Sequence, residues 1–160
     1  MEMRKIMENI VSKVECNNQI IQVKLLNVEK NPLFVGNIFK EISKNDVNID
    51  MISQVMLEDE MRIDFTCDIK DQHLLNKALE DIKEKHPRIM IYQNRKVAKI
   101  MVEGKGMKNA VGVASNLFDI FGRNQVPIYQ VTTSDISISY VIDKEYMDLI
   151  VLEIKKDYEL

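Results

Sequence analysis

The residues best suited to chemistry lie in two loops that lead from a strand into a helix. The first loop, 27–33, reads Asn-Val-Glu-Lys-Asn-Pro-Leu, and the second, 104–111, reads Gly-Lys-Gly-Met-Lys-Asn-Ala-Val. At the N-terminus of a helix, free backbone N–H groups and the helix dipole favour a carboxylate. Both loops are therefore candidate sites for a small molecule that carries a carboxylate.

Each loop is expected to face the start of the strand that follows its helix. The polar side chains of those strands are Asn48, Asp50 and Gln54 in the first case, and Gln130, Thr132 and Ser134 in the second. Amide and hydroxyl acceptors beside N–H donors suit a free amino acid, whose ammonium and carboxylate need opposite partners. The alternative is that these are ordinary loop and capping residues, and the loops alone leave it open.

The hydrophobic periodicity predicts the elements that position the loops. Alternation predicts strands at 20–28, 47–57, 61–69 and 88–93. Asn31-Pro32 opens one amphipathic helix, and His86-Pro87 ends another. The resulting order, β-α-β-β-α-β, is the ferredoxin-like unit. The pattern then recurs, with strands at 97–103, 127–133 and 136–142, a helix at 109–123, and a last helix lined by Tyr146, Leu149, Ile150 and Ile154.

The two halves match position by position, which indicates an internal repeat. Phe39 corresponds to Phe118, Val47 to Val126 and Ile49 to Ile128. The second half lacks a fourth strand, whereas 9–16 alternates like a spare one. We predict an α+β fold of two ferredoxin-like modules, in which module 17–94 is inserted in module 95–160 and strand 9–16 completes the second sheet. The alternative, an extra edge strand on the first module, leaves an open sheet edge.

Few residues point to catalysis or to a cofactor. His73 and His86 have no Ser or Cys partner in a recognisable constellation, and the sequence has no Walker-type or GxGxxG loop. Cys16 and Cys67 are too few for a zinc site or a disulfide framework. We therefore predict no catalytic residue, no metal and no cofactor, in a reduced and cytoplasmic protein.

The net charge and the hydropathy of the sequence argue against two classes of partner. The 22 Lys and Arg residues and the 25 Asp and Glu residues give a net charge of −3, whereas a nucleic-acid surface is usually basic. No apolar run reaches the roughly 18 residues that span a bilayer, and the N-terminus does not read as a signal peptide. We predict neither nucleic acid nor membrane as a partner.

Several segments resemble the regulatory part of aspartokinases (aspartate kinases). In the second half they are 97–100, 104–108, 112–114, 117–118 and Gln-Val-Thr-Thr-Ser-Asp-Ile-Ser-Ile-Ser at 130–139, which is similar to the family's ISTSEIKIS segment. In the first half, Asn-Ile-Asp-Met-Ile-Ser-Gln at 48–54 resembles the family's NVDMIxQ stretch. The resemblance covers essentially the whole chain. It implies two ACT domains, which bind amino acids and regulate biosynthetic enzymes.

The resemblance further implies feedback regulation by an end-product amino acid, lysine or threonine. The expected effector contacts are Lys30, Asn31, Pro32, Leu33, Phe34, Asn48, Asp50, Ile52 and Gln54 in the first module, and Lys108, Asn109, Ala110, Val111, Gln130, Thr132, Ser134 and Asp135 in the second. The loop amides are expected to take the carboxylate, and the strand side chains the ammonium or side chain. The implied partners are an aspartokinase catalytic domain or subunit and a second copy of the chain, because ACT sheets commonly pair edge to edge.

The first loop departs from the family pattern, which reads roughly GVPDKPG. Lys30 replaces the acidic residue and Leu33 the final glycine, which reverses a charge and obstructs close approach of a ligand to the backbone. No kinase motif precedes the modules, so we expect a separate regulatory (beta) subunit, an excised fragment or a free-standing protein. Two other functions are a free-standing amino-acid sensor and a dimerisation module without a working ligand site. A small phosphatase is disfavoured because neither loop has an arginine.

Overall fold

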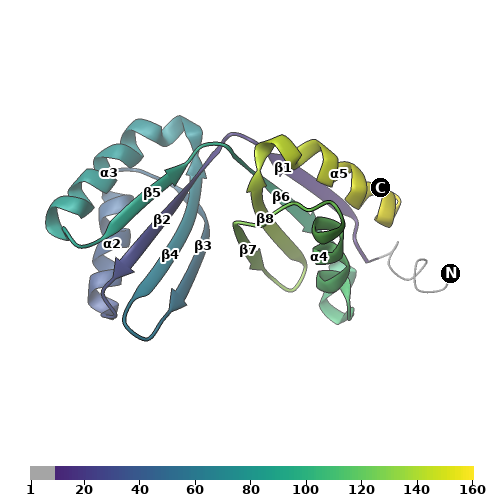
Figure 1. Cartoon of the computed structure of the whole chain (residues 1–160), viewed down its shortest axis with the longest axis horizontal. Coiled ribbons are helices and arrows are strands. Elements are labelled where there is room, and N and C mark those ends of the chain that lie inside the picture. The colour runs from purple at the N-terminus through teal and green to yellow at the C-terminus, as the bar shows by residue number, and fades with distance from the viewer. Residues whose placement is uncertain (1–9) are drawn as a thin grey trace. The chain divides into compact units, whose positions relative to one another are not determined.

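The structure, a computed structural model, describes residues 10–160 and divides into two compact units (Figure 1). One unit comprises Gln19–Arg95. The other combines the segment that ends at Asn18 with Lys96–Leu160. Each unit has its own four-stranded antiparallel sheet and its own hydrophobic core.

The Gln19–Arg95 unit has the predicted β-α-β-β-α-β order. Its elements are β2 (Ile20–Val28), α2 (Pro32–Lys44), β3 (Ile49–Met56), β4 (Met61–Asp68), the short 3-10 helix η1 (Ile69–Asp71), α3 (Gln72–Lys85) and β5 (Met90–Asn94). The strand order is β3-β4-β2-β5, so the first strand lies inside the sheet and the second and fourth strands form its edges. This is the ferredoxin-like arrangement.

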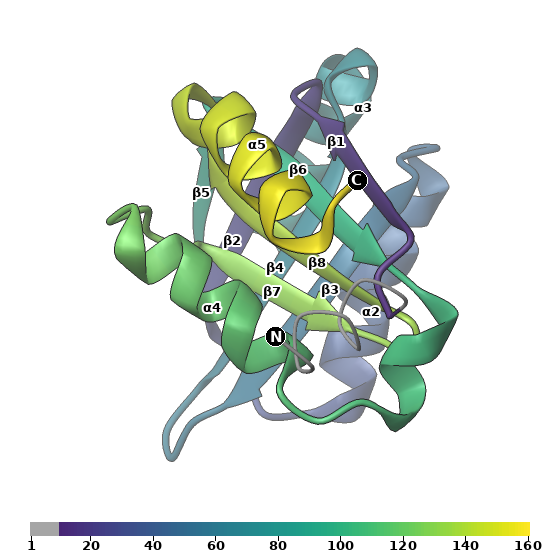
Figure 2. The ribbon, with the colours of Figure 1, turned by 90° about the vertical axis from the view of Figure 1, so that its right-hand side faces the viewer.

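The second unit repeats this arrangement with a strand borrowed from the N-terminal segment. Its elements are β1 (Lys13–Asn17), β6 (Val97–Glu103), η2 (Lys105–Asn109), α4 (Val113–Arg123), β7 (Gln130–Thr133), β8 (Ser137–Asp143), η3 (Lys144–Tyr146) and α5 (Met147–Tyr158). The strand order is β1-β6-β8-β7. β1 thus holds the place that β5 holds in the other unit. Figure 2 shows this sheet with α4 and α5 across one face.

The predicted insertion of one module in the other is confirmed by the pairing of β1 with β6. Val14 lies opposite Val102, and Cys16 lies opposite Ile100. The predicted strand began at Asn9, which lies outside the described residues. Because β1 covers the edge of β6, the strand that follows the first unit becomes an interior strand of the second sheet.

Each core lies between the sheet and its two helices. In α2, Ile38 and Ile42 are fully buried, and in α4 the predicted inward residues Val113, Leu117, Ile120 and Phe121 are all buried. The apolar line predicted for the last helix is wrong at Leu149, which is 40% exposed, because Ile150 and Ile154 occupy the inward face. Across residues 10–160, no helix is both long and apolar enough to cross a membrane.

The predicted start of α4 at Asn109 is wrong by one turn. The backbone forms the 3-10 helix η2 as far as Asn109 and is extended at Ala110. Gly112 then adopts φ of 93°, in the left-handed region that favours glycine, and α4 begins at Val113. A helix does not run through such a residue, so η2 and α4 are separate.

Candidate functional site

The loop between β2 and α2 is fastened on two sides. Asn27 has a φ of 57°, and its backbone N–H donates to Glu60 Oε2 at 2.5 Å. The Asn27 side chain donates from Nδ2 to the carbonyl oxygen of Arg88 at 3.0 Å, and Lys30 Nζ donates to the carbonyl oxygen of Glu58. The loop is thereby held against both the β3–β4 hairpin and the segment that links α3 to β5.

The first turn of α2 uses most of the N–H groups that were expected to hold a carboxylate. Asn31 is the N-cap, as predicted, and its side-chain oxygen accepts from Leu33 N at 3.0 Å. The N–H of Asn31 donates to Glu29 O, and Pro32 has none. Leu33 is 69% exposed. Of this predicted set, Phe34 keeps an amide that the capping contacts do not use, so the helix N-terminus alone is a poor anion site.

The structure does not bring the first loop to the start of β3, which corrects the expected geometry. β2 and β3 are both antiparallel to β4 and so run in the same direction. The loop follows the end of β2, where Val28 lies opposite Met61. The β3 strand begins at the other end of the sheet, where Ile49 lies opposite Cys67. Asn48 and Asp50 are therefore remote from the loop in the same chain.

The remaining two predicted contacts of the first module lie further along β3. Ile52, 51% exposed, lies opposite Phe65, and Gln54 is exposed opposite Ile63. β3 is an edge strand, so one side of its backbone has no neighbouring strand in this sheet. The predicted first-module residues thus fall into two separate groups, one on the loop and one along a sheet edge.

In the second module, the structure brings the loop to the β7–β8 turn. Gly104 N donates to Ile136 O at 2.8 Å, which places Ser134 and Asp135 beside the loop. The Ser134 hydroxyl accepts from Ile136 N at 3.3 Å, so it serves the turn itself. Gln130 is buried and lies at the far end of β7, and Thr132 lies between them opposite Ser139.

The other predicted residues of this loop project into solvent or belong to η2. Lys108 and Asn109 are exposed at the end of η2, and Val111 is fully exposed. Ala110 is partly buried against the core of its own unit. Because α4 begins only at Val113, the amides near Lys108–Val111 do not form the N-terminus of a long helix. The expectation that they do is wrong.

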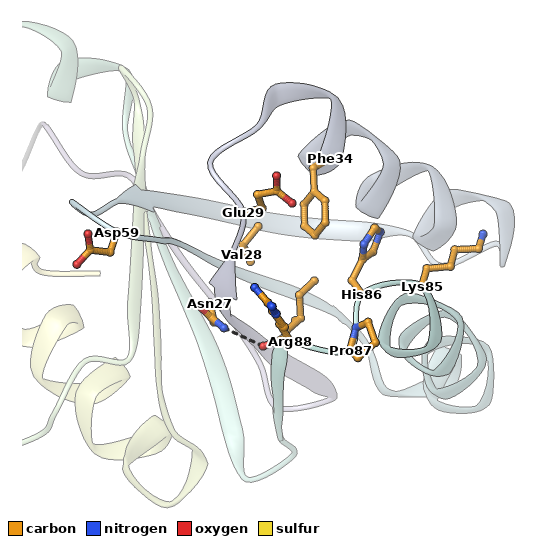
Figure 3. A pocket seen from close by; sticks show the side chains of 10 residues that line it. Asn27, Val28, Glu29, Phe34, Asp59, Lys85, His86, Pro87 and Arg88 are labelled. Carbon is orange, nitrogen blue, oxygen red and sulfur yellow. Dashed lines mark hydrogen bonds between the residues drawn. The ribbon is translucent and has the colours of Figure 1, made fainter.

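A cleft in the Gln19–Arg95 unit lies on the inner side of the first loop. Its volume is about 550 Å³. Its walls come from the end of β2 and the following loop, the first turn of α2, the β3–β4 hairpin and the end of α3. The lining residues are Asn27, Val28, Glu29, Phe34, Asp59, Lys85, His86, Pro87, Arg88 and Ile89. Figure 3 shows Glu29 and Phe34 on the α2 side, Lys85 at the end of α3, and His86 and Arg88 on the segment that follows α3.

The cleft combines an apolar wall with charged groups of both signs. The rings of Phe34 and His86 are in contact, with centroids 4.0 Å apart. Lys85 is paired with Glu41. Within residues 10–160, no hydrogen bond or ion pair engages the side chains of Glu29 or Arg88. Such a site can hold a small zwitterion, with an acid for its cation and a guanidinium for its anion.

Most of this cleft was missed by the sequence reasoning. Phe34 alone was among the predicted contacts, although the first loop was identified. His86-Pro87 was interpreted as a helix end, which it is, since α3 ends at Lys85. The missed signal was that the chain after this helix returns to the end of the sheet where β2 finishes and the first loop begins. In the described part of the chain, no group of three or more His, Cys, Asp or Glu side chains is placed to hold a metal.

Comparison with known proteins shows which sequences and structures this chain resembles. The ACT domain family profile matches residues 100–158. The aspartokinase of Pseudomonas aeruginosa is 30% identical over 154 residues, and aspartokinase 2 of Bacillus subtilis is 28% identical over 151 residues. Each alignment covers 94% of this chain and 37% of the relative. The solved aspartokinase alpha and beta subunits match with a TM-score of 0.85 at 23% identity, over 94% of this chain and 99% of that chain.

The second unit thus matches the ACT domain family, and the nested ferredoxin-like fold of the chain is also the fold of the solved aspartokinase subunits. In sequence, the chain is similar to part of the aspartokinases over 94% of its own length. It spans about 37% of the length of the curated aspartokinases that it matches.

Proposed function

We propose that this chain is the effector-binding regulatory unit of an aspartate kinase, and that its effector is an end-product amino acid, lysine or threonine. The observation that carries the proposal is that similarity to aspartokinases runs through both modules, over 94% of the chain. A shared ACT module alone would leave the regulated enzyme open. Similarity over two modules, one nested in the other, favours one kind of enzyme.

The choice of an amino acid has support from a related structure and from the cleft. A structure of aspartokinase III of E. coli is a complex with lysine and aspartate, and its fold matches with a TM-score of 0.71 at 14% identity, over 93% of this chain and 33% of that chain. In this chain, the cleft beside the first loop offers both a guanidinium and a carboxylate. These are the groups that a free amino acid needs.

On this proposal, the effector regulates the kinase by shifting the protein from one arrangement to another. An effector changes kinase activity only if it binds one arrangement more tightly than the other. The first loop suits such a role because it connects the β3–β4 hairpin with the α3–β5 segment through Asn27 and Lys30. A ligand in the cleft contacts the same three segments, so binding can change how they are held together.

The proposed partners are an aspartate kinase catalytic domain or subunit and a second copy of this chain. A catalytic partner is in keeping with the aspartokinase structure described as containing alpha and beta subunits. A second copy is supported by the edge strand β3, where Ile52, Val55 and Met56 are each more than half exposed. Exposed apolar side chains along an edge strand favour association with another sheet.

A second candidate is a dimerisation module without a working ligand site. Two observations favour it: Leu33 is 69% exposed on the first turn of α2, and Lys30 is bound to the hairpin carbonyl of Glu58. Both residues depart from the family pattern at the first loop. This candidate predicts that neither lysine nor threonine binds.

A kinase assay tests the proposed function. An aspartate kinase catalytic chain from the same organism is mixed with this chain, and aspartate-dependent ADP formation is followed with increasing lysine or threonine. We expect one of the two amino acids to inhibit in a saturable way only when this chain is present. Activity that stays constant at all concentrations of both amino acids contradicts the proposal.

A further inference from the structure

We propose that Lys30 and Glu60 clamp the first loop to the β3–β4 hairpin, and that this clamp controls how the edge strand β3 is presented to a second copy of the chain. The clamp is local to the Gln19–Arg95 unit. Its effect on association rests on the proposed function, which assigns a second copy to β3. What is added is the part of the fold that regulates this association.

The clamp consists of two hydrogen bonds that run in opposite directions between the loop and the hairpin. The backbone N–H of Asn27 donates to Glu60 Oε2 at 2.5 Å, and Lys30 Nζ donates to the carbonyl oxygen of Glu58. Each segment therefore supplies one side chain and one backbone group. A charged group takes part in both hydrogen bonds, and such bonds are stronger than those between neutral groups.

An irregularity in β2 makes the N–H of Asn27 available to the hairpin. β2 pairs regularly with β4 as far as Leu25, and the next pair is Val28 opposite Met61. Asn27 lies between these pairs with a φ of 57°, in the left-handed region that Asn tolerates better than most residues. A residue at such an irregularity is left out of the regular pairing between strands. Its N–H reaches Glu60 instead.

The hairpin side of the clamp is the turn beyond the paired strands. The last β3–β4 pair is Met56 opposite Met61. Within the turn, Leu57 N donates to Glu60 O at 2.8 Å. The Glu60 side chain is only 24% exposed, and its Oε1 lies 3.7 Å from Arg62 Nε. Glu60 therefore joins the turn, β4 and the first loop.

Charge complementarity favours the closed clamp. The turn carries three consecutive acidic residues, Glu58, Asp59 and Glu60, and Lys30 is the one cationic residue in the sequence of loop 27–33. Opposite charges a few ångströms apart attract each other, and salt screens the attraction. The clamp should therefore loosen when Lys30 loses its charge, and also at high ionic strength.

The second unit fastens its loop to its hairpin in another way. The backbone N–H of Gly104 donates to Ile136 O at 2.8 Å. Within the part of the chain that the structure describes, no hydrogen bond or ion pair engages the side chains of Lys105, Lys108 or Asn109. The clamp is therefore a feature of one module, and the ferredoxin-like fold does not by itself require it.

The clamp lies beside the end of the strand that is proposed to meet a second copy. β3 ends at Met56, where the turn begins, and Val55 and Met56 are both more than half exposed. With the clamp open, the turn and the end of β3 have more conformations to lose when a second copy binds. A closed clamp thus favours association, and an open clamp weakens it.

Amide hydrogen exchange of the full chain, with no amino acid added, tests the clamp. The readouts are the amides of Asn27 and Leu57, which donate within the clamp and the turn. Lys30 Nζ contacts neither amide in these hydrogen bonds, so faster exchange in Lys30→Met means that the loop has lifted. We expect exchange about threefold to tenfold faster in Lys30→Met, because an exposed contact is lost, and faster still in Lys30→Glu, which adds repulsion.

A second variant and matched controls keep the test specific. Glu60→Gln keeps an acceptor but removes the charge, and exchange should be about tenfold faster. Lys40→Met on α2 and Glu84→Gln on α3 remove the same charges at exposed positions away from the loop and the hairpin, and should exchange like the wild type. The Ser134 amide in the second unit, which donates to Ser137 O, should be unchanged in every variant.

Sedimentation equilibrium of the same variants tests the link to a second copy. Because the closed form is the one ready to associate, the dissociation constant should rise as the closed fraction falls. We expect a rise of about twofold to fivefold in Lys30→Met and a larger one in Lys30→Glu. Lys40→Met should associate like the wild type.

Each outcome decides a different point. Exchange at Asn27 and Leu57 that is equal in Lys30→Met, Glu60→Gln and the wild type overturns the clamp. Faster exchange with unchanged association overturns the link to β3 and leaves the clamp and the proposed effector function standing. If the wild type does not associate at any concentration, the proposed second copy and the link both fail, whereas the exchange rates still decide the clamp.

Discussion

At the residue scale, the two cysteines differ in what surrounds them. Cys16 is exposed on the edge strand β1, whereas Cys67 is buried in β4 at the core of the other unit. Burial raises the pKa of the Cys67 thiol to about 12, with smaller contributions from the nearby charges of Asp71 and Asp68. A thiol reacts as its thiolate, so Cys67 is protected by both its position and its pKa.

We therefore predict that the native chain reacts at one thiol only at pH 8. A disulfide reagent such as Ellman's reagent should label Cys16 rapidly and reach Cys67 only after unfolding in denaturant. Release of the coloured thiolate measures the number of reacting groups. The variant Cys16→Ser should show no fast phase. Rapid reaction of two thiols in the native wild type would contradict the burial of Cys67.

Single residues could be predicted where the signal was local. Asn31 and Pro32 mark the start of α2 by their own chemistry, and the structure confirms Asn31 as the cap. Glu29 and Arg88 could not be found in this way. They meet in one cleft only because β2 and β5 are neighbours in the sheet, and neither has a local sequence pattern.

At the element scale, Gly104 allows β1 to complete the second sheet. A Cβ atom at this position would lie 1.8 Å from the carbonyl oxygen of Ile10, just before β1. That neighbour is backbone and cannot rotate away. The sequence reasoning placed Gly104 in a candidate ligand loop, but the structure gives it this packing role. The φ of Gly104 is −175°, which other residues also adopt, so the requirement is steric.

The variant Gly104→Ala should destabilise the unit that contains β1. Displacing a backbone segment is expected to cost about 1–3 kcal/mol of the free energy of unfolding. Native-state hydrogen exchange at the β6 amides measures this cost, because β6 pairs with β1. Gly122→Ala is the control: no atom lies within 4 Å of its new Cβ, and it should stabilise α4 by up to about 1 kcal/mol. Equal exchange rates in Gly104→Ala and the wild type would contradict this role.

Helices and strands with a clear hydrophobic period were predicted correctly, but the residues at which some of them begin were not. β2 and β6 have the bounds expected from alternation. The start of α4 was misplaced because the apolar spacing of 109–123 continues across Gly112, whose left-handed backbone separates η2 from the helix. Periodicity reports which face is buried, whereas the point where a helix begins depends on backbone angles that the pattern does not carry.

At the scale of the whole molecule, the insertion of one module in the other could be predicted by counting strands. The position of the first loop relative to β3 could not. A module with three strands and a spare strand upstream can be completed in few ways, and β1 fills the vacant place beside β6. The expected contact between the first loop and the start of β3 failed, because two strands that flank β4 must run the same way. This placed Asn48 and Asp50 at the other end of the sheet.

The most direct test of the account is an NMR titration of the full, isotope-labelled chain with lysine and with threonine. If the chain is an effector-binding unit, one of the two amino acids should shift a localised group of amide signals in a saturable way. Signals that stay unchanged with both amino acids would contradict the account.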